Sequence, residues 1–495
     1  MTSQTLRDAR RYEEAMAQNI TAQERPEFHL SPRVGWMNDP NGLVYYKGLY
    51  HLFYQYNPKS CKWDSMHWGH AVSEDMIHWK DMPVALKPDQ EYDCHPEGGC
   101  FSGSAVEKDG VLFLFYTATT QIDGVVHQTQ CIATSKDGMT FEKYPNNPVI
   151  KEPPQGFSND FRDPKVFKHN GKWYMVVGGC IGSATFDGDG RICLYESDDL
   201  YNWKYKGNVL ESNGKLGTMM ECPDMFELNG KWVVTCSPMN HPDYNKSLYC
   251  VGTMDFENCI YTIEKMGNMD VGFDYYAPQS FTDKEGNRVL IAWQNGWLWM
   301  PWCIDWGPTS LENWRGCLSV PRKVQLDSEN NLCMYPVKEV ESLISQTVTY
   351  TDMEIGEKAI KLYDDPNRSN RIILKLDITK IESRNLEICV LGKESSYTAI
   401  QIDFLSKIIT LDKSYGDHYE GGRMNCPFEL HDNYLELCIL VDHSSVEVYV
   451  NHGEKCITTN VYPEENQTEC WIRTPYKKAV VDYVQIDFLT SSWEV

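Results

Sequence analysis

The chain of 495 residues is long enough for two or more domains, each with its own buried core. Its 70 Asp and Glu residues outnumber its 46 Lys and Arg residues, so the formal net charge is −24. This charge repels nucleic acid and anionic lipid, and it favours an uncharged partner. No apolar run approaches the length that a membrane span needs, so no membrane partner is expected.

Residues 1–27 are predicted to form an N-terminal helical extension, with Leu6, Ala9 and Met16 on one side of an amphipathic helix. The first twenty positions include several charged residues, whereas a secretory signal would have an apolar core there. The 18 cysteines are scattered and form no Cys-x-x-Cys pair, which favours reduced thiols. We therefore expect a cytoplasmic protein.

An internal repeat of about sixty residues begins near residue 28. In each repeat a glycine precedes an aromatic or aliphatic strand, and these glycines are Gly48, Gly110, Gly171, Gly230 and Gly286. A unit of this length, made of short strands between turn residues, predicts one four-stranded sheet per repeat. Five such sheets around one axis form a five-bladed β-propeller, expected over residues 28–335.

A carboxylate recurs at one position of this repeat. Eight or nine residues before the five glycines stand Asp39, Ser102, Asp163, Glu221 and Ala277, so three of the five positions are acidic. We expect this position on the innermost strand of each sheet, where the side chains meet at the axis. Carboxylates gathered in this way are costly unless they are hydrogen-bonded or used in catalysis, so the three are predicted to be functional.

A second pattern supports the same period. The segments Ser73 to Trp79, Ser135 to Phe141 and Ser197 to Trp203 each read Ser-x-Asp-x-x-x-aromatic. We expect a turn that leads into an outer strand. After the repeats, residues 336–347 are predicted to form a linker, and the alternating strands of residues 348–495 predict a β-sandwich.

Paired carboxylates suit glycoside hydrolysis. One ionised carboxylate attacks the anomeric carbon while a second, still protonated, donates its proton to the leaving oxygen. The third, paired with its neighbour Arg162, is expected to stay ionised and to bind sugar hydroxyls.

Groups suited to sugar binding surround these motifs. Asn38, Gln55, Ser102 and Asp274 offer hydrogen bonds, and Trp63, Trp68, Tyr276 and Trp293 offer flat faces. Six tryptophans lie between Trp293 and Trp314, and some are expected at the mouth of the pocket. His67 and His70 lack the spacing of metal ligands, and no nucleotide-binding motif occurs, so neither a metal nor another cofactor is expected.

The motifs together resemble glycoside hydrolase family 32, the β-fructofuranosidases, which include invertases and sucrose-6-phosphate hydrolases. The resemblance rests on Trp36-Met-Asn-Asp-Pro-Asn-Gly42, Phe101-Ser-Gly-Ser104, Phe161-Arg-Asp-Pro164 and Glu221-Cys-Pro223. It extends through Trp68-Gly-His-Ala71, Arg315-Gly-Cys-Leu-Ser-Val-Pro-Arg322 and Val441-Asp-His-Ser-Ser-Val-Glu447.

The resemblance implies a five-bladed propeller followed by a β-sandwich, and a retaining mechanism on terminal non-reducing β-fructofuranosyl units of sucrose and related fructosides. In this interpretation Asp39 is the nucleophile, Glu221 the acid/base and Asp163 the transition-state stabiliser. The implied fructose-binding residues are Asn38, Gln55, Trp63, Phe101, Ser102, Arg162, Tyr276 and Trp293.

Several alternatives stay open at this point. Sucrose, sucrose 6-phosphate, fructo-oligosaccharides and inulin all fit as the small-molecule or oligosaccharide partner, and a homo-oligomer is not excluded. An inverting propeller hydrolase that cleaves arabinan or xylan would share the three carboxylates. A sugar-binding propeller without catalysis would be expected to have lost at least one of them.

Overall fold

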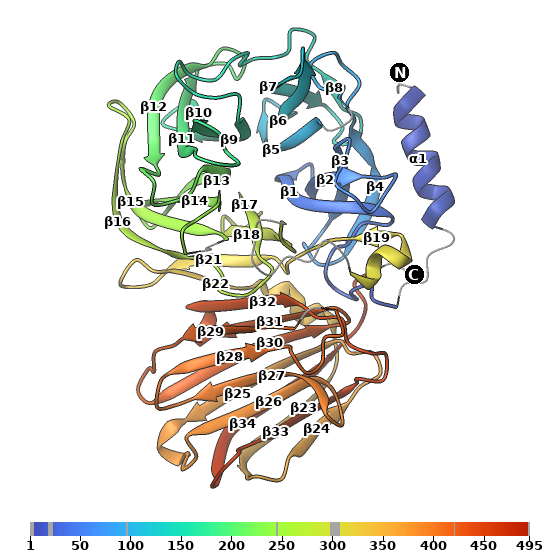
Figure 1. Ribbon diagram of the computed structural model, residues 1–495, viewed down its shortest axis with the longest axis vertical. Coiled ribbons are helices and arrows are strands. Elements are labelled where there is room, and N and C mark those ends of the chain that lie inside the picture. Colours follow the sequence, from blue (N-terminus) through green and yellow to red (C-terminus); the bar gives the residue numbers. More distant parts are fainter. Residues whose placement is uncertain are drawn as a thin grey trace.

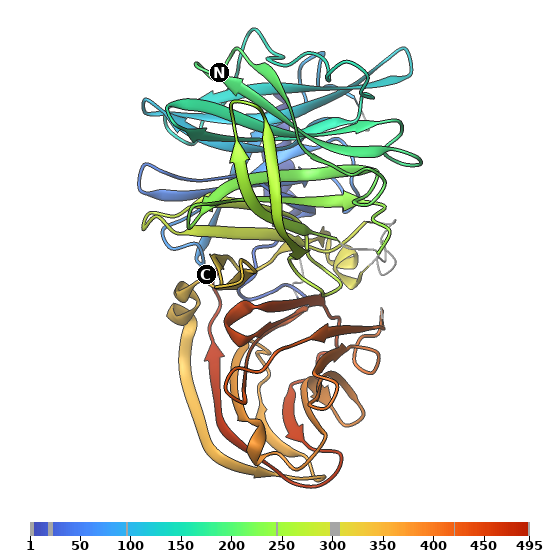
Figure 2. The same cartoon turned by 90° about the vertical axis from the view of Figure 1, so that its left-hand side faces the viewer.

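The computed structural model describes residues 4–17, 23–95, 98–243, 246–297, 307–419 and 421–493. The described chain is dominated by strands, which form a β-propeller followed by a β-sandwich (Figures 1 and 2). This arrangement confirms the predicted all-β class and the order of the two domains.

The first domain contains five sheets that follow one another in the sequence. The first three comprise β1 (Gly35–Tyr46), β2 (Leu49–Asn57), β3 (His67–Ser73) and β4 (Trp79–Leu86); β5 (Gly99–Lys108), β6 (Val111–Ile122), β7 (Val125–Ser135) and β8 (Glu142–Lys143); and β9 (Phe161–His169), β10 (Lys172–Ile181), β11 (Asp189–Ser197) and β12 (Lys204–Glu211). The last two comprise β13 (Met219–Leu228), β14 (Lys231–Met239), β15 (Leu248–Asp255) and β16 (Ile260–Asn268); and β17 (Tyr276–Thr282), β18 (Arg288–Gln294), β20 (Cys317–Leu318), β21 (Arg322–Leu326) and β22 (Leu332–Pro336). The short strand β19 (Trp314–Arg315), which follows helix η1 (Pro308–Glu312), pairs in parallel with β1.

Two-residue turns explain why the repeat contains its glycines. The turns Lys47-Gly48, Asp109-Gly110, Asn170-Gly171 and Asn229-Gly230 have positive φ at both positions. That backbone matches the twist of the paired strands in a tight hairpin, and glycine adopts it without steric cost. Each of these glycines therefore marks the connection from an innermost strand to the second strand of its sheet.

The innermost strands β1, β5, β9, β13 and β17 contact one another in a closed ring around the axis (Figure 1). Each has an interruption in its register at the position that the repeat singled out, between Met37 and Pro40 in β1 and between Glu221 and Asp224 in β13, for example. A bulge bends the strand and redirects a side chain. Equivalent side chains from different sheets consequently point to one place.

The Ser-x-Asp pattern forms the predicted turn three times. In each case the Ser hydroxyl and the Asp carboxylate accept hydrogen bonds from the backbone N–H groups that follow them. These turns lead into β4, β8 and β12, the outermost strands of their sheets.

Helix α1 (Gln4–Ala17) lies along β4 at the side of the propeller (Figure 1). Ala9 is buried there, and Glu13 accepts a hydrogen bond of 2.7 Å from the hydroxyl of Tyr56. The side chain of Leu6 lies outside the described residues.

The second domain packs two six-stranded antiparallel sheets face to face. One contains β23 (Ile344–Ile355), β34 (Ala479–Leu489), β25 (Asn370–Asp377), β30 (Tyr434–Asp442), β31 (Ser445–Val450) and β32 (Lys455–Asn460); the other contains β24 (Ile360–Asp364), β33 (Glu469–Arg473), β26 (Asn385–Lys393), β27 (Ser396–Asp403), β28 (Ile408–Asp412) and β29 (Arg423–Pro427). The short 3-10 helix η3 (Ile378–Lys380) follows β25, and η4 (Asn451–Gly453) connects β31 to β32. Alternate residues such as Ile372, Leu374 and Leu376 fill the core between the sheets.

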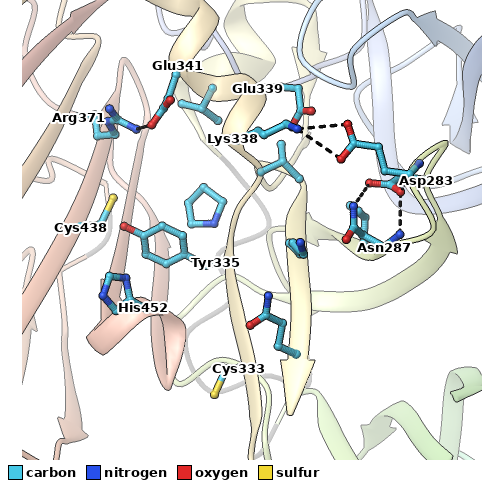
Figure 3. A pocket seen from close by; sticks show the side chains of 17 residues that line it. Asp283, Asn287, Cys333, Tyr335, Lys338, Glu339, Glu341, Arg371, Cys438 and His452 are labelled. Carbon is cyan, nitrogen blue, oxygen red and sulfur yellow. Dashed lines mark hydrogen bonds and ion pairs between the residues drawn. The ribbon is translucent and has the colours of Figure 1, made fainter. Parts of the chain in front are cut away.

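The predicted linker contains helix η2 (Lys338–Leu343), which borders a cavity of about 450 Å³ between the domains. Tyr335 stands in this cavity, and the charged groups around it are largely paired with one another (Figure 3). Lys338 binds Glu285 at 3.2 Å, and Arg371 binds Glu341 at 3.3 Å. The opposite charges of each pair neutralise each other. We therefore interpret this cavity as a structural cleft between the domains.

A buried charge cluster joins the two domains. The guanidinium of Arg322 contacts Asp270 of the propeller at 2.9 Å and Glu447 of the sandwich at 3.1 Å. The imidazole of His29 contacts Asp442 at 2.8 Å and Glu447 at 3.0 Å. All five side chains are fully buried, so the cations must balance the carboxylates.

These contacts shift the pKa values of the cluster. Burial disfavours the charged imidazole, but Asp442 and Glu447 outweigh burial and raise the pKa of His29 to about 9. Burial likewise opposes ionisation of Glu447, but Arg322 and His29 lower the pKa of its carboxyl to about 2.

We predict that His29→Leu lowers the free energy of unfolding by about 3–5 kcal/mol, because it leaves two buried carboxylates short of a cation. The stabilisation by protonated His29 is fully present below its ordinary pKa of 6.5 and is lost as the pH rises through about 9. Chemical denaturation at about pH 6 and about pH 10 measures both effects. His431→Gln is the control, because His431 is exposed and its pair with Glu454 contributes little. An equal loss in the two variants would contradict the prediction.

Candidate active site

A cavity of about 300 Å³ lies at the end of the propeller where the innermost strands begin. It is lined by Asn38, Asp39, Gln55, Trp63, Phe101, Ser102, Gln128, Arg162, Asp163, Glu221, Met239 and Trp297. The three carboxylates of the repeat therefore meet in one cavity, as the repeat predicts.

Asp39, in the bulge of β1, is held through one of its two carboxyl oxygens. Oδ2 accepts a hydrogen bond of 2.6 Å from the hydroxyl of Ser102 and lies 3.5 Å from the thiol of Cys222. Oδ1 is buried and has no hydrogen-bond partner among the described residues. The carboxylate is thus oriented through its Oδ2 atom.

Asp163 is oriented by backbone groups of two strands. Its Oδ2 accepts a hydrogen bond of 2.9 Å from the N–H of Cys222, and its own N–H donates to Thr117 Oγ1 at 2.9 Å. Cys222 has a φ of 47°, an unusual conformation for a residue with a side chain. The bulges of β9 and β13 are therefore joined directly at the carboxylate.

Each carboxylate oxygen of Glu221 accepts a hydrogen bond from a different side chain. Arg162 donates from Nε to Glu221 Oε1 at 2.9 Å, and Tyr276 donates its hydroxyl to Oε2 at 2.5 Å. The expectation that Arg162 pairs with its sequence neighbour Asp163 is wrong, because its ion-pair partners are Glu221 and Asp160. Both side chains line the cavity, but the carboxylate of Asp163 accepts its hydrogen bond from the N–H of Cys222 and the guanidinium of Arg162 reaches Glu221.

Burial controls the ionisation of the two aspartates. It raises the pKa of Asp39 to about 6, an effect that the charge of Glu221 reinforces and the hydrogen bond from Ser102 opposes. Burial also raises the pKa of Asp163, with Arg162 opposing and Glu221 and Asp39 reinforcing the change. Asp163 is thus not the residue of low pKa that its position beside Arg162 suggested.

Most of the other predicted residues line the cavity. Asn38 accepts a hydrogen bond of 2.7 Å from Trp36 Nε1, and Gln55 donates one of 2.9 Å to the carbonyl of Cys100. These bonds fix the two amides at the wall. Trp63 and Phe101 form an aromatic pair with ring centroids 5.5 Å apart.

Four further candidates lie outside this lining. Tyr276 and Trp293 stand behind it, Tyr276 in contact with Glu221 and Trp293 with its ring centroid 4.9 Å from that of Trp297. Trp68 is fully buried and donates to the carbonyl of Phe101. Asp274 accepts a hydrogen bond from Asn460 of the sandwich and belongs to the domain interface.

Gln128 and Met239 also line the cavity, although neither belongs to a predicted motif. Gln128 Oε1 accepts hydrogen bonds from Phe161 N and Arg162 Nη1, and Met239 Sδ lies 3.3 Å from Arg162 Nη2. In the sequence, Gln128 and Gln130 are two residues apart on one strand, and this alternation was the signal that could have indicated Gln128. Of the tryptophan-rich stretch, Trp297 lines the cavity, and residues 298–306 lie outside the described residues.

The histidines that were considered as metal ligands contact other groups instead. His51 Nδ1 lies 3.1 Å from His70 Nε2, and His67 Nδ1 lies 2.6 Å from the carbonyl of Ser65. Within the described ranges, no group of three His, Cys, Asp or Glu side chains is placed to hold a metal ion.

Comparison with known proteins identifies the class. The model of the N-terminal domain of glycosyl hydrolases family 32 matches residues 29–336, and that of the family's C-terminal domain matches residues 339–487. The fold and the cavity are those of a glycoside hydrolase. The two matches span most of the chain, which therefore belongs to glycosyl hydrolases family 32.

Related proteins and solved structures are consistent with this family. A sucrose-6-phosphate hydrolase of Zymomonas mobilis is 35% identical over 471 residues, which cover 90% of this chain and 88% of that protein. A raffinose invertase of Escherichia coli is 34% identical over 469 residues, with 92% and 93% covered. The structure of a variant β-fructofuranosidase of Bombyx mori in complex with sucrose superposes with a TM-score of 0.85, at 29% identity and 100% coverage of both chains.

We predict that Ser102→Ala moves the acidic limb of the kcat/KM profile to higher pH. The Ser102 hydroxyl stabilises ionised Asp39, so its loss should raise the pKa of Asp39 above the value of about 6. A shift of about one unit is expected, since hydrogen bonds to charged groups contribute about 1.5–3 kcal/mol and one unit equals about 1.4 kcal/mol. Ser104→Ala, on the same strand but bonded to Pro164, is the control and should leave the limb unchanged. An unmoved limb in Ser102→Ala would refute the assignment.

Proposed function

We propose that this protein hydrolyses terminal non-reducing β-fructofuranosyl units of sucrose and related fructosides through a covalent fructosyl-enzyme. The observation that carries the proposal is the meeting of Asp39, Asp163 and Glu221, from equivalent bulges of three strands, in one cavity. Family 32 glycoside hydrolases retain the configuration of the anomeric carbon, so a carboxylate nucleophile and an acid/base are both required.

Asp39 is the nucleophile in this proposal. Ser102 and Cys222 hold its Oδ2 and fix the direction of the carboxylate in the cavity. Because the pKa of Asp39 is about 6, most of the carboxyl is ionised at neutral pH and can form the ester with the fructosyl carbon.

Glu221 is the acid/base. It donates a proton to the leaving oxygen in the first step and accepts one from water in the second. Arg162 and Tyr276 each hold one of its oxygens, which restricts the carboxyl to one orientation through both steps. These two hydrogen bonds also keep Glu221 in place while the substrate is converted into the covalent intermediate.

Asp163 binds sugar hydroxyls and stabilises the charge that develops on the ring. Its Oδ2 is held by Cys222 N–H, and the carboxyl faces the same cavity as the other two. Asn38, Gln55, Trp63, Phe101 and Ser102 complete the fructose-binding wall in this proposal, and Tyr276 and Trp293 support it from behind.

Family membership argues against the two alternatives from other classes. An inverting arabinan or xylan hydrolase would not carry the family's C-terminal domain, which matches residues 339–487. A binding module without catalysis would not be expected to keep all three carboxylates in the cavity.

We also propose a reducing, cytoplasmic location. All seventeen cysteines of the described chain are free thiols, and most are buried. Proteins of oxidising compartments more often pair such residues. No helix among the described residues is long and apolar enough to cross a membrane.

We predict that Asp39→Asn folds normally but loses at least about 10⁴-fold in kcat on sucrose, because an amide cannot form the ester intermediate. The measurement is glucose release, with thermal unfolding as a check on the fold. Asp64→Asn, on the loop that carries Trp63, is the control for loss of one negative charge near the cavity. Turnover of Asp39→Asn near the wild-type rate would remove Asp39 from this role.

Glu221→Ala should discriminate between substrates by their leaving groups. Sucrose needs a proton on its leaving oxygen, whereas an activated aryl fructoside departs with little protonation. We expect a loss of about 10²–10⁴-fold on sucrose, the usual contribution of general acid catalysis, and a much smaller loss in the first step on the aryl fructoside. Pre-steady-state release of the aryl group measures that step. Equal losses on both substrates would show that Glu221 only positions the sugar.

A further inference from the structure

The N-terminal helix contacts the loop that carries Trp63. Helix α1 lies along β4, and its hydrogen bonds reach the end of β2 and the loop that follows this strand (Figure 1). This loop, residues 58–66, connects β2 to β3, and its Trp63 lines the cavity. The helix is therefore linked to a wall of the cavity, although none of its described residues lines the cavity itself.

Two consecutive residues of α1 make these hydrogen bonds. Tyr12 donates its hydroxyl to the carbonyl of Lys59, the second residue of the loop, at 3.2 Å. Glu13 Oε1 accepts a hydrogen bond of 2.7 Å from the hydroxyl of Tyr56, which is buried near the end of β2. The helix thus holds the chain on both sides of Asn57, the residue at which β2 ends.

The side chain of Asn57 braces the first half of the loop. Its Nδ2 donates to Ser60 Oγ at 3.2 Å and to the carbonyl of Lys62 at 2.9 Å. Its Oδ1 accepts a hydrogen bond of 3.0 Å from the N–H of Lys59. Residues 57–62 are therefore connected as one unit, so a shift of Lys59 is passed on to Lys62, the residue before Trp63.

The second sheet fixes the other end of the loop. The N–H of Met66 donates to the carbonyl of Gly98, directly before β5, at 2.9 Å. Between the two ends, the ring of Trp63 lies 5.5 Å from that of Phe101 and 6.3 Å from that of Trp297, measured between centroids. Contacts between apolar rings are less directional than hydrogen bonds, so the position of Trp63 depends on how firmly the loop is held at its ends.

Substitutions in α1 can remove these hydrogen bonds without opening the core of the propeller. Among the described side chains of the helix only Ala9 is fully buried. Cavities of about 530 Å³ and about 100 Å³ lie beside the helix, and Arg10 borders both. The helix is thus in partial contact with the propeller, and an effect of Tyr12 and Glu13 on the loop is separable from an effect on the fold.

We propose that α1 is a positioning element of the active site, in which Tyr12 and Glu13 hold residues 58–66 so that Trp63 stays in the wall of the cavity. The inference rests on the proposed function, in which this wall binds the fructosyl unit. A sugar that meets a wall already in place loses less binding energy to the ordering of the protein. Loss of the two hydrogen bonds therefore weakens binding of the sugar, while the carboxylates on the innermost strands keep their geometry.

The test uses the full-length double variant Tyr12→Phe/Glu13→Ala, which removes both hydrogen bonds. We expect KM for sucrose and the inhibition constant of free fructose to rise together, about three- to tenfold, with kcat within about twofold of the wild-type value. Such a pattern shows a loss of binding that the ground state and the transition state share. A merely structural role of the helix would lower the active fraction, and hence the apparent kcat, without changing KM.

Two further variants serve as controls. Glu13→Gln keeps an oxygen that can accept the hydrogen bond from Tyr56, so it should retain the wild-type KM. Arg11→Ala changes an exposed residue of the same helix and should also leave KM unchanged.

A double-mutant cycle tests whether the helix acts through Trp63. Trp63→Ala alone should raise KM. Adding Tyr12→Phe/Glu13→Ala to it should then change KM by less than about twofold, because the side chain that the helix positions is gone.

Hydrogen exchange gives a readout that does not depend on activity. In Tyr12→Phe/Glu13→Ala the amides of residues 58–66 should exchange at least about tenfold faster than in the wild-type protein, and those of β9 at the wild-type rate. The inference is overturned if KM stays unchanged, if the helix and Trp63 variants have additive effects on KM, or if exchange accelerates only within α1. Failure to cleave any fructoside would reject the proposed function, and hydrogen exchange would then decide by itself whether the helix holds the loop.

Discussion

Three carboxyl groups gathered in one small cavity, two of them buried, are the constraint on which the rest of this site depends. Burial raises the pKa values of Asp39 and Asp163, and the charge of Glu221 reinforces both changes. The protein offsets this cost with one guanidinium, Arg162, and with hydrogen bonds from Ser102 and from the backbone of Cys222.

The closed ring of innermost strands makes such an arrangement rigid. A bulge at the same place in every sheet turns the equivalent side chains toward the axis, and each strand is supported by its neighbours on both sides. A loop could not hold three repelling groups so closely, because the loop would move to separate them. Trp297, on the segment that follows β18, lines the same cavity from outside this ring.

The sandwich supports the site from the side of the fifth sheet. Gln294, at the end of β18, donates to Ser445 Oγ at 2.5 Å, and Asn460 donates to the carbonyl of Gln294 at 3.0 Å. Asp274, two residues before Tyr276, accepts from the backbone of Asn460. Tyr276 holds Glu221, and Trp297 lines the cavity, so the second domain fixes the segments that carry two parts of the site.

Much of this organisation is contained in the sequence. The period of the glycines determined the sheets, because a turn with two positive φ angles favours glycine together with Asn or Asp. The same period placed Asp39, Asp163 and Glu221 at equivalent positions of the innermost strands. Only the tertiary structure decided which groups touch. Arg162 binds Glu221 of the next sheet and not its sequence neighbour Asp163, Asp274 faces the sandwich, and Gln128 and Met239 join the cavity. A local pattern specifies turns and strand faces, whereas contacts between sheets depend on how the ring closes, which no local pattern records.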